Sequence, residues 1–155
     1  RYPIEVAFRA LRDADNAQEI AEDDTPDLSL LRVCRAEVKS ALDEVKRLAP
    51  RFSKTERVAL FEFSDPNRIQ PLLAQSWHGR LPRFIVIAAN SGWLPGSVAF
   101  SARTSSGANV LEFMQRFRDD MPGELEYGYG HDQASGGVVS REGWERLKAA
   151  MGFTL

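Results

Sequence analysis

Residues 58–66 read VALFEFSDP, and here the hydrophobic pattern changes from helical to strand spacing. The mostly apolar and aromatic run Val58–Phe63 predicts a buried strand. Asp65 and Pro66 then offer an N-cap residue and a proline at the first helical position, so a helix is expected to begin there. A buried strand followed at once by a helix indicates a domain of the α/β class.

The chain after this stretch continues to alternate between helical and strand patterns. The expected elements are a helix over 69–77, strands over 84–89 and 98–103, a helix capped by Asn109, a glycine-rich loop within 125–139 that leads into a strand, and a last helix capped by Ser140. This order predicts an α/β fold with a mixed β-sheet of about four or five strands flanked by helices.

The first 52 residues predict a helical connector. Apolar residues at helical spacing predict a helix over 3–21, and the charged run 22–27 predicts a linker. Apolar residues from Leu31 to Leu48 keep near-heptad spacing and predict a second helix. We therefore expect a connector over residues 1–52 and an α/β domain over residues 53–155.

Composition limits the class of protein. The chain has 155 residues, of which 43% are hydrophobic, and a net charge of −2. Because this charge gives no global basic field, any contact with a polyanion must be local. The single cysteine, Cys34, cannot form an intramolecular disulfide, and no apolar run approaches the ~18 residues of a membrane span. We expect a cytoplasmic protein with no membrane partner. The start at Arg1 suggests a fragment of a longer protein, although a trimmed start would look the same.

The residues that usually hold metals or act as nucleophiles are sparse. Only two histidines occur, His78 and His131, and no cysteine pair accompanies them. Asp13 and Asp15 lie two apart on a predicted helix and so point to different faces. No nucleophile elbow or phosphate-binding P-loop is present. The sequence therefore predicts no metal site and no catalytic residue in this chain.

Two stretches could bind an anion. Residues 127–137 read YGYGHDQASGG, where glycines allow positive φ and successive N–H groups can face a ligand, with His131 as a further donor. Arg103 ends a predicted strand between hydroxyl residues and offers a planar fork of donors for phosphate oxygens. Each stretch also has a purely structural interpretation: residues 127–137 could be a flexible hairpin loop, and Arg103 could be an ordinary surface charge.

Taken in order, the two stretches resemble a known family. Residues 96–103 (GSVAFSAR) match a G-x-V-x-x-S-x-R strand, and residues 128–136 (GYGHDQASG) match a G-G-G-H-x-x-A-x-G loop. Both are typical of the DHH-associated C-terminal domain of DHH-family phosphoesterases, which include RecJ-like single-strand exonucleases, oligoribonucleases and cyclic-dinucleotide phosphodiesterases. The chain departs from the pattern at Tyr129, which replaces the middle glycine and could offer a base a stacking surface.

This resemblance implies a substrate-binding domain of a hydrolase that cleaves phosphodiester bonds. The implied partners are single-stranded nucleic acid or a small nucleotide, and the N-terminal DHH catalytic domain of the same protein. That domain would hold Mn²⁺ (or Mg²⁺), so this chain would carry no cofactor and be inactive alone. The implied phosphate-binding residues are Ser101, Arg103, Thr104, Gly128, Gly130, His131 and Gly136.

Two alternatives stay open. The first is a non-catalytic nucleic-acid-binding or dimerisation module, like the one appended to alanyl-tRNA synthetases, with the heptad-like helix as the seam of a possible homodimer. The second is an α/β interaction domain in which the loop glycines serve only to turn the chain.

Overall fold

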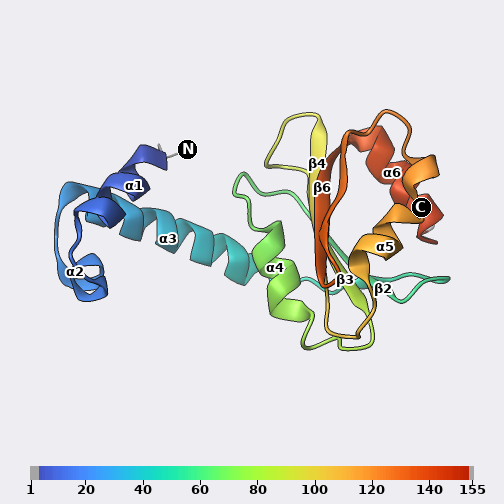
Figure 1. The fold of residues 1–155 in the computed structure, drawn as a ribbon, viewed down its shortest axis with the longest axis horizontal. Helices are drawn as coiled ribbons and strands as arrows, with labels where there is room; N and C mark the ends of the chain where they lie inside the picture. Colours follow the sequence, from blue (N-terminus) through green and yellow to red (C-terminus); the bar gives the residue numbers. More distant parts are fainter. Residues whose placement is uncertain (1–3, 154–155) are drawn as a thin grey trace. The chain divides into compact units, whose positions relative to one another are not determined.

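The computed structural model describes residues 4–153, and the stretch that begins at Val58 is a buried strand as expected. Figure 1 labels the six helices and the strands β2, β3, β4 and β6. The helices are α1 Ile4–Asp13, α2 Ala17–Glu22, α3 Pro26–Val45, α4 Gln70–Trp77, α5 Val110–Gln115 and α6 Arg141–Ala150, with a short 3-10 helix at Arg118–Asp120. The strands are β1 Arg51–Phe52, β2 Val58–Phe63, β3 Ile85–Asn90, β4 Ser97–Thr104, β5 Glu126–His131 and β6 Ala134–Ser140.

The six strands form one mixed sheet in the order β1-β2-β3-β4-β6-β5. Strands β2 and β3 pair in parallel, and the other neighbours pair antiparallel. The predicted α/β class with a mixed sheet is confirmed. The strand count exceeds the expected four or five because β1 adds a short edge strand and residues 126–140 form a two-stranded hairpin.

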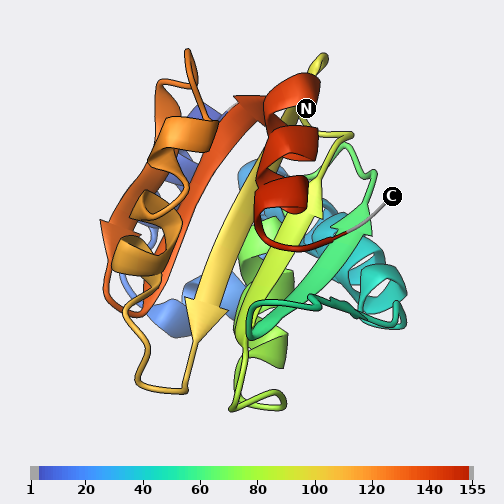
Figure 2. The ribbon, with the colours of Figure 1, turned by 90° about the vertical axis from the view of Figure 1, so that its right-hand side faces the viewer.

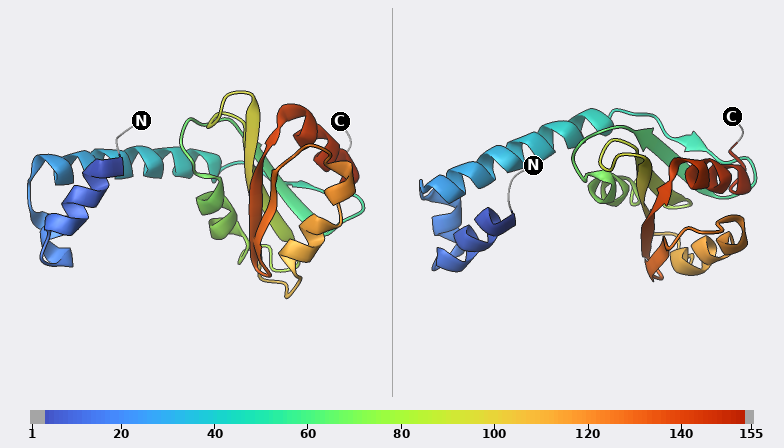
Figure 3. Two further views of the ribbon diagram at one scale, coloured as in Figure 1. Left: turned by 45° about the horizontal axis from the view of Figure 1, so that its top comes forward. Right: turned by 90° about the horizontal axis from the view of Figure 1, so that it is seen from above.

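Helices cover both faces of the sheet. Helix α4 packs against β3 and β4 on one face, while α5 and α6 pack on the other (Figures 2 and 3). The larger core lies under α5 and α6, and its buried members include Val58, Leu60, Ile85, Ile87, Val98, Phe100, Phe113, Met114, Tyr127, Trp144 and Leu147. Residues that alternate with these along β2 and β3, such as Phe61 and Ala88, are buried on the face of α4.

The first helical region differs from the predicted single helix over 3–21. Helix α1 ends at Asp13, and Asn16 caps α2 by accepting hydrogen bonds from the N–H groups of Gln18 and Glu19. The chain divides into two compact units within α3, one up to Ala41 and one from Leu42 onward. None of the helices within residues 4–153 combines the length and the apolar character that a membrane span requires.

Two of the three predicted helix caps are present. The side chain of Asn109 accepts from Glu112 N, and that of Ser140 accepts from Gly143 N. The prediction for Asp65 is wrong, because its carboxylate accepts from Asn67 N in a tight turn and α4 begins only at Gln70.

Candidate functional site

The predicted glycine-rich loop is a β-hairpin. Strand β5 ends at His131, β6 begins at Ala134, and only Asp132 and Gln133 connect them. Strand β6 lies between β4 and β5, so its backbone pairs on both sides. The prediction of a loop with successive N–H groups facing a ligand is therefore wrong for β6, because the two ladders take those groups.

A bulge in β5 decides which tyrosine faces the core. Glu126 pairs with Val138 and Tyr129 pairs with Gly136, so β5 has one residue more than β6 between these pairs. Gly128 lies in the bulge with a φ of 70°. Tyr127 is 1% exposed and its hydroxyl donates to Met114 O at 2.6 Å. The extra residue turns Tyr129 to the opposite face, where it is 64% exposed.

Arg103 and His131 lie in one row across three strands. Arg103 pairs with Ala134 of β6, and Ala134 pairs with His131 of β5. Residues directly opposite each other in antiparallel strands point to the same face. Neighbouring strands lie about 4.8 Å apart, which places the two Cα atoms about 10 Å from each other. The sheet thus brings two predicted site residues, 28 positions apart, to one face.

The residues between them are small. Ala134 separates Arg103 from His131, and in the next row on the same face Gly136 separates Ser101 from Tyr129. No long side chain from β6 rises between the flanking strands at these two rows. The small residues of β6 thus leave space above the sheet between the cationic side chain of Arg103 on β4 and the side chains of His131 and Tyr129 on β5.

Helix α4 fixes the side chain of Arg103. Its Nε donates to Gln75 Oε1 at 3.3 Å, and Gln75 Nε2 is 3.1 Å from His78 Nε2. Among residues 4–153 the Arg103 guanidinium forms no further hydrogen bond or ion pair, so its two terminal nitrogens remain available to an oxyanion. Sequence reasoning missed Gln75, because nothing in its own neighbourhood indicates that it meets a strand 28 residues later.

His131 is exposed, with Asp132 beside it. The Nδ1 atom lies 3.3 Å from the donating N–H of Gln133 and 3.2 Å from Asp132 Oδ1. When Gln133 N donates to Nδ1, the neutral ring carries its proton on Nε2, which is then a donor to a ligand. In a protonated ring both nitrogens are donors.

The other predicted site residues are placed less favourably. Thr104 pairs with Ile85 on the core side, and its hydroxyl is 2.8 Å from Ser106 Oγ. Ser101 is on the face of Arg103 but only 6% exposed. Gly130 and Gly136 allow close backbone approach, because a Cβ would lie 2.0 Å from Ala134 O and 2.6 Å from Phe100 O respectively. The structure therefore brings Arg103 and His131 to one face of the sheet, with Ser101 in the next row of the same face. Thr104 lies on the opposite face.

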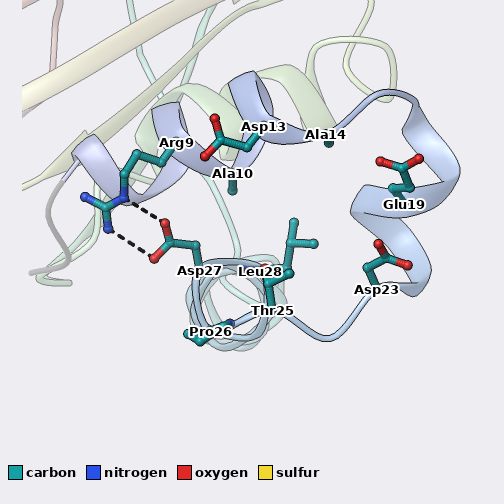
Figure 4. A pocket seen from close by; sticks show the side chains of 10 residues that line it. All are labelled: Arg9, Ala10, Asp13, Ala14, Glu19, Asp23, Thr25, Pro26, Asp27 and Leu28. Carbon is teal, nitrogen blue, oxygen red and sulfur yellow. Dashed lines mark hydrogen bonds and ion pairs between the residues drawn. The ribbon is translucent and has the colours of Figure 1, made fainter.

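The side chains of the described residues do not fit a metal centre. Within residues 4–153, no group of three or more His, Cys, Asp and Glu side chains is arranged to hold an ion. Figure 4 shows a hollow in the first unit that Asp13, Glu19 and Asp23 line, together with the ion pair of Arg9 and Asp27. The carboxylate of Asp13 already binds Arg12 at 2.6 Å, and this contact lowers the pKa of Asp13.

Comparisons with known proteins identify the fold. No family model matches the sequence, and no curated protein matches it either. Among solved structures, a pGpG-specific phosphodiesterase, PggH from Vibrio cholerae, has a TM-score of 0.57 and 17% identity over 97% of this chain. The manganese-bound exonuclease RecJ gives a TM-score of 0.57 and 18% identity over 97%. RecJ from Thermus thermophilus in complex with Mg²⁺ has a TM-score of 0.51 and 21% identity over 95% of this chain.

The neighbours are longer than this chain. It spans 50% of the phosphodiesterase chain, 37% of the manganese-bound RecJ chain and 22% of the Thermus thermophilus RecJ chain. The phosphodiesterase and RecJ are both DHH-family proteins. The chain therefore shares its fold with part of these DHH-family phosphodiesterases and exonucleases, and this is the fold that its two motifs predicted.

Proposed function

We propose that this chain is the substrate-binding domain of a DHH-type phosphoesterase, in which Arg103 and His131 hold a phosphate of the substrate. The observation that carries the proposal is the row Arg103–Ala134–His131, in which a guanidinium and an imidazole flank a small residue on one face of the sheet. A phosphate above Ala134 is within reach of the Arg103 fork and of a ring N–H of His131. The substrate class is single-stranded nucleic acid or a small nucleotide.

The hydrolytic centre belongs, in this proposal, to another domain of a longer protein, where Mn²⁺ or Mg²⁺ would activate water. Two observations support this. Residues 4–153 lack a metal-binding group, and the chain spans half or less of the three solved neighbours. Within such an enzyme, this domain orients the substrate and offsets charge that builds on phosphate.

An exposed apolar stripe on α1 is a candidate contact with that domain. Ile4, Phe8 and Leu11 are spaced by four and three residues and are 80%, 67% and 60% exposed. Contiguous apolar side chains of this size on a surface are typical of interaction sites.

A homodimer through α3 and a cytoplasmic location also belong to the proposal. The alternative function is a non-catalytic nucleic-acid module, in which the row of Arg103, Ala134 and His131 would bind RNA without cleaving it.

The test is titration of the chain with a 5′-phosphorylated dinucleotide at low and moderate salt. Arg103→Ala is expected to weaken binding by about 10- to 100-fold, because a charge-assisted and bidentate contact is worth about 1.5–3 kcal/mol. Arg103→Lys should recover only part of the loss, since a point charge does not reproduce the fork. The affinity of the native chain should fall as salt rises.

A matched control separates site binding from net charge. Arg116 is also exposed and also an arginine, but it follows α5 on the other face, where it binds Glu56 at 2.7 Å. Arg116→Ala changes the net charge equally and should leave the affinity unchanged. Equal losses for the two variants would mean that the ligand follows net charge, and the site assignment would be wrong.

A further inference from the structure

Helix α4 carries two side chains behind Arg103 that the phosphate-binding row does not include. Arg103 Nε donates to Gln75 Oε1 at 3.3 Å, and Gln75 Nε2 lies 3.1 Å from Nε2 of His78. His78 follows the last residue of α4, and its carbonyl oxygen accepts from Ser105 Oγ at 2.9 Å, just after β4 ends. Arg103, Gln75 and His78 therefore form one chain of contacts between the sheet and the helix.

The direction of these hydrogen bonds follows from Arg103. An arginine Nε is always a donor, so the amide atom of Gln75 that faces it must be the oxygen. The amide nitrogen, which only donates, then faces His78 Nε2, and that ring atom must accept. An imidazole accepts at Nε2 only when it is neutral and carries its proton on Nδ1. Within residues 4–153, His78 Nδ1 is buried without a hydrogen-bond partner, so Gln75 sets this tautomer.

Protonation of His78 reverses what the ring requires of Gln75. In the charged ring both nitrogens donate, so Nε2 no longer accepts from Gln75 Nε2. If the amide rotates to offer its oxygen to His78, its nitrogen faces Arg103 Nε, and two donors oppose each other. The charged form of His78 and the hydrogen bond between Arg103 and Gln75 therefore exclude each other. Histidine side chains change charge within the physiological range of pH, so the exclusion can act there.

The charged groups around His78 offer it no other acceptor. Helix α4 packs on β3 and β4, and these three elements contain one ionisable side chain, Arg103. On β2, Glu62 lies on the opposite face, against α6. The turn 79–84 after α4 adds two arginines. Since none of these elements turns a carboxylate to His78, a charged ring would draw the oxygen of Gln75.

We propose that His78 regulates the phosphate-binding arginine through Gln75. The neutral ring holds the amide that positions Arg103, and the charged ring releases it. Gln75 and His78 are positioning residues, because they act on Arg103 and not on the phosphate. This inference rests on the proposed function and adds that the contribution of Arg103 to phosphate binding weakens in acid for a reason that lies outside the row.

A double-mutant cycle at pH 8 tests the connection between Gln75 and Arg103. The affinity of a 5′-phosphorylated dinucleotide is measured for the native chain, Gln75→Leu, Arg103→Ala and the double variant. Gln75→Leu removes the acceptor and should weaken binding by about 2- to 10-fold, the effect of one hydrogen bond. The same substitution should have no effect once residue 103 is alanine. Gln115→Leu, at an exposed glutamine of α5, is the matched control and should bind like the native chain.

The pH dependence separates positioning from a purely structural role. The affinity ratio of the native chain to Gln75→Leu should fall to about 1 at about pH 5, because charged His78 cancels the contribution of Gln75. Changes of charge at His131 or on the ligand occur in both proteins and leave this ratio unaffected. His78→Gln supplies an amide acceptor that does not titrate, so in that background the ratio should keep its value from pH 8.

The outcomes distinguish this inference from the proposed function. If Arg103→Ala weakens binding and Gln75→Leu does not, the regulation is refuted and phosphate binding stands. The regulation is likewise refuted if Gln75→Leu costs the same with and without Arg103, or if its effect does not change with pH. If Arg103→Ala binds like the native chain, the proposed function and the regulation fail together.

Discussion

Single polar residues connect segments that are distant in the sequence. Asn90 is fully buried at the end of β3, where its Oδ1 accepts from Asp65 N and its Nδ2 donates to Asn67 O. These bonds fix the turn that delays the start of α4 to Gln70. The position of α4 in turn decides that Gln75, on its last turn, meets Arg103.

The contribution of the single residue Lys148 to stability is expected to depend on pH. It is 9% exposed, and its Nζ lies 3.0 Å from Glu62 and 2.9 Å from Glu145. Burial by itself would lower the pKa of Lys148, but the two carboxylates outweigh it and raise that pKa. Because the folded pKa exceeds the unfolded value of about 10.4, the stabilisation is complete below that pH and is lost as pH rises through the folded pKa.

The measurement is the free energy of unfolding of the native chain and of Lys148→Met, from denaturant titrations between pH 8 and pH 11. The advantage of the native chain over the variant should shrink at the alkaline end. Lys39→Met, at an exposed position of α3, serves as the control and should show no such trend. A difference that stays constant with pH would mean that Lys148 does not gain from its two carboxylates.

Local sequence predicted some of these residues and failed at others for a physical reason. The caps at Asn109 and Ser140 were predictable, because a cap bonds to N–H groups within three residues of itself. The turn at Asp65 depends on Asn90, 25 residues away. Arg103 was identified by its type and its place on a strand, whereas its contact with Gln75 exists only in the folded chain.

At the scale of elements, the β5–β6 hairpin shows why the glycines were misread. Glycine is depleted in strands, so a run rich in glycine predicts a loop. Here the glycines permit backbones to approach each other, since a Cβ on Gly137 would lie 2.2 Å from Glu126 O. The alternation of strands and helices from Val58 onward was predictable from periodicity, but the position of β6 between β4 and β5 was not.

Substitution of two of these glycines should destabilise the domain for different reasons. In Gly136→Ala the new Cβ would lie 2.6 Å from Phe100 O, so the backbone of β4 or β6 must shift, at a cost of about 1–3 kcal/mol. In Gly128→Ala the nearest atom is 3.8 Å away, and the cost of about 1–2 kcal/mol comes from the positive φ.

Denaturant titrations measure the free energy of unfolding of both variants, and Gly79→Ala serves as the control. A Cβ at Gly79 meets nothing within 4 Å, and its φ is not positive, so this control should change stability by less than about 0.5 kcal/mol. If Gly136→Ala were as stable as the control, the close approach of β4 and β6 would not be a constraint on the fold.

The whole chain is expected to bind substrate without hydrolysing it. Incubation with Mn²⁺ and a labelled oligonucleotide should release no product above a protein-free control, because residues 4–153 offer no group that could hold a metal. Metal-dependent turnover that follows the purified chain through chromatography and disappears with a chelator would contradict this account.

The central claim is that Arg103 and His131 contact the same phosphate, and a double-mutant cycle tests it most directly. The affinity of a 5′-phosphorylated dinucleotide is measured for the native chain, Arg103→Ala, His131→Ala and the double variant. Because both side chains flank Ala134 in one row, their contributions should be coupled, with an interaction energy of about 0.5–3 kcal/mol. Losses that simply add, or single variants that bind like the native chain, would show that the two residues do not share a ligand.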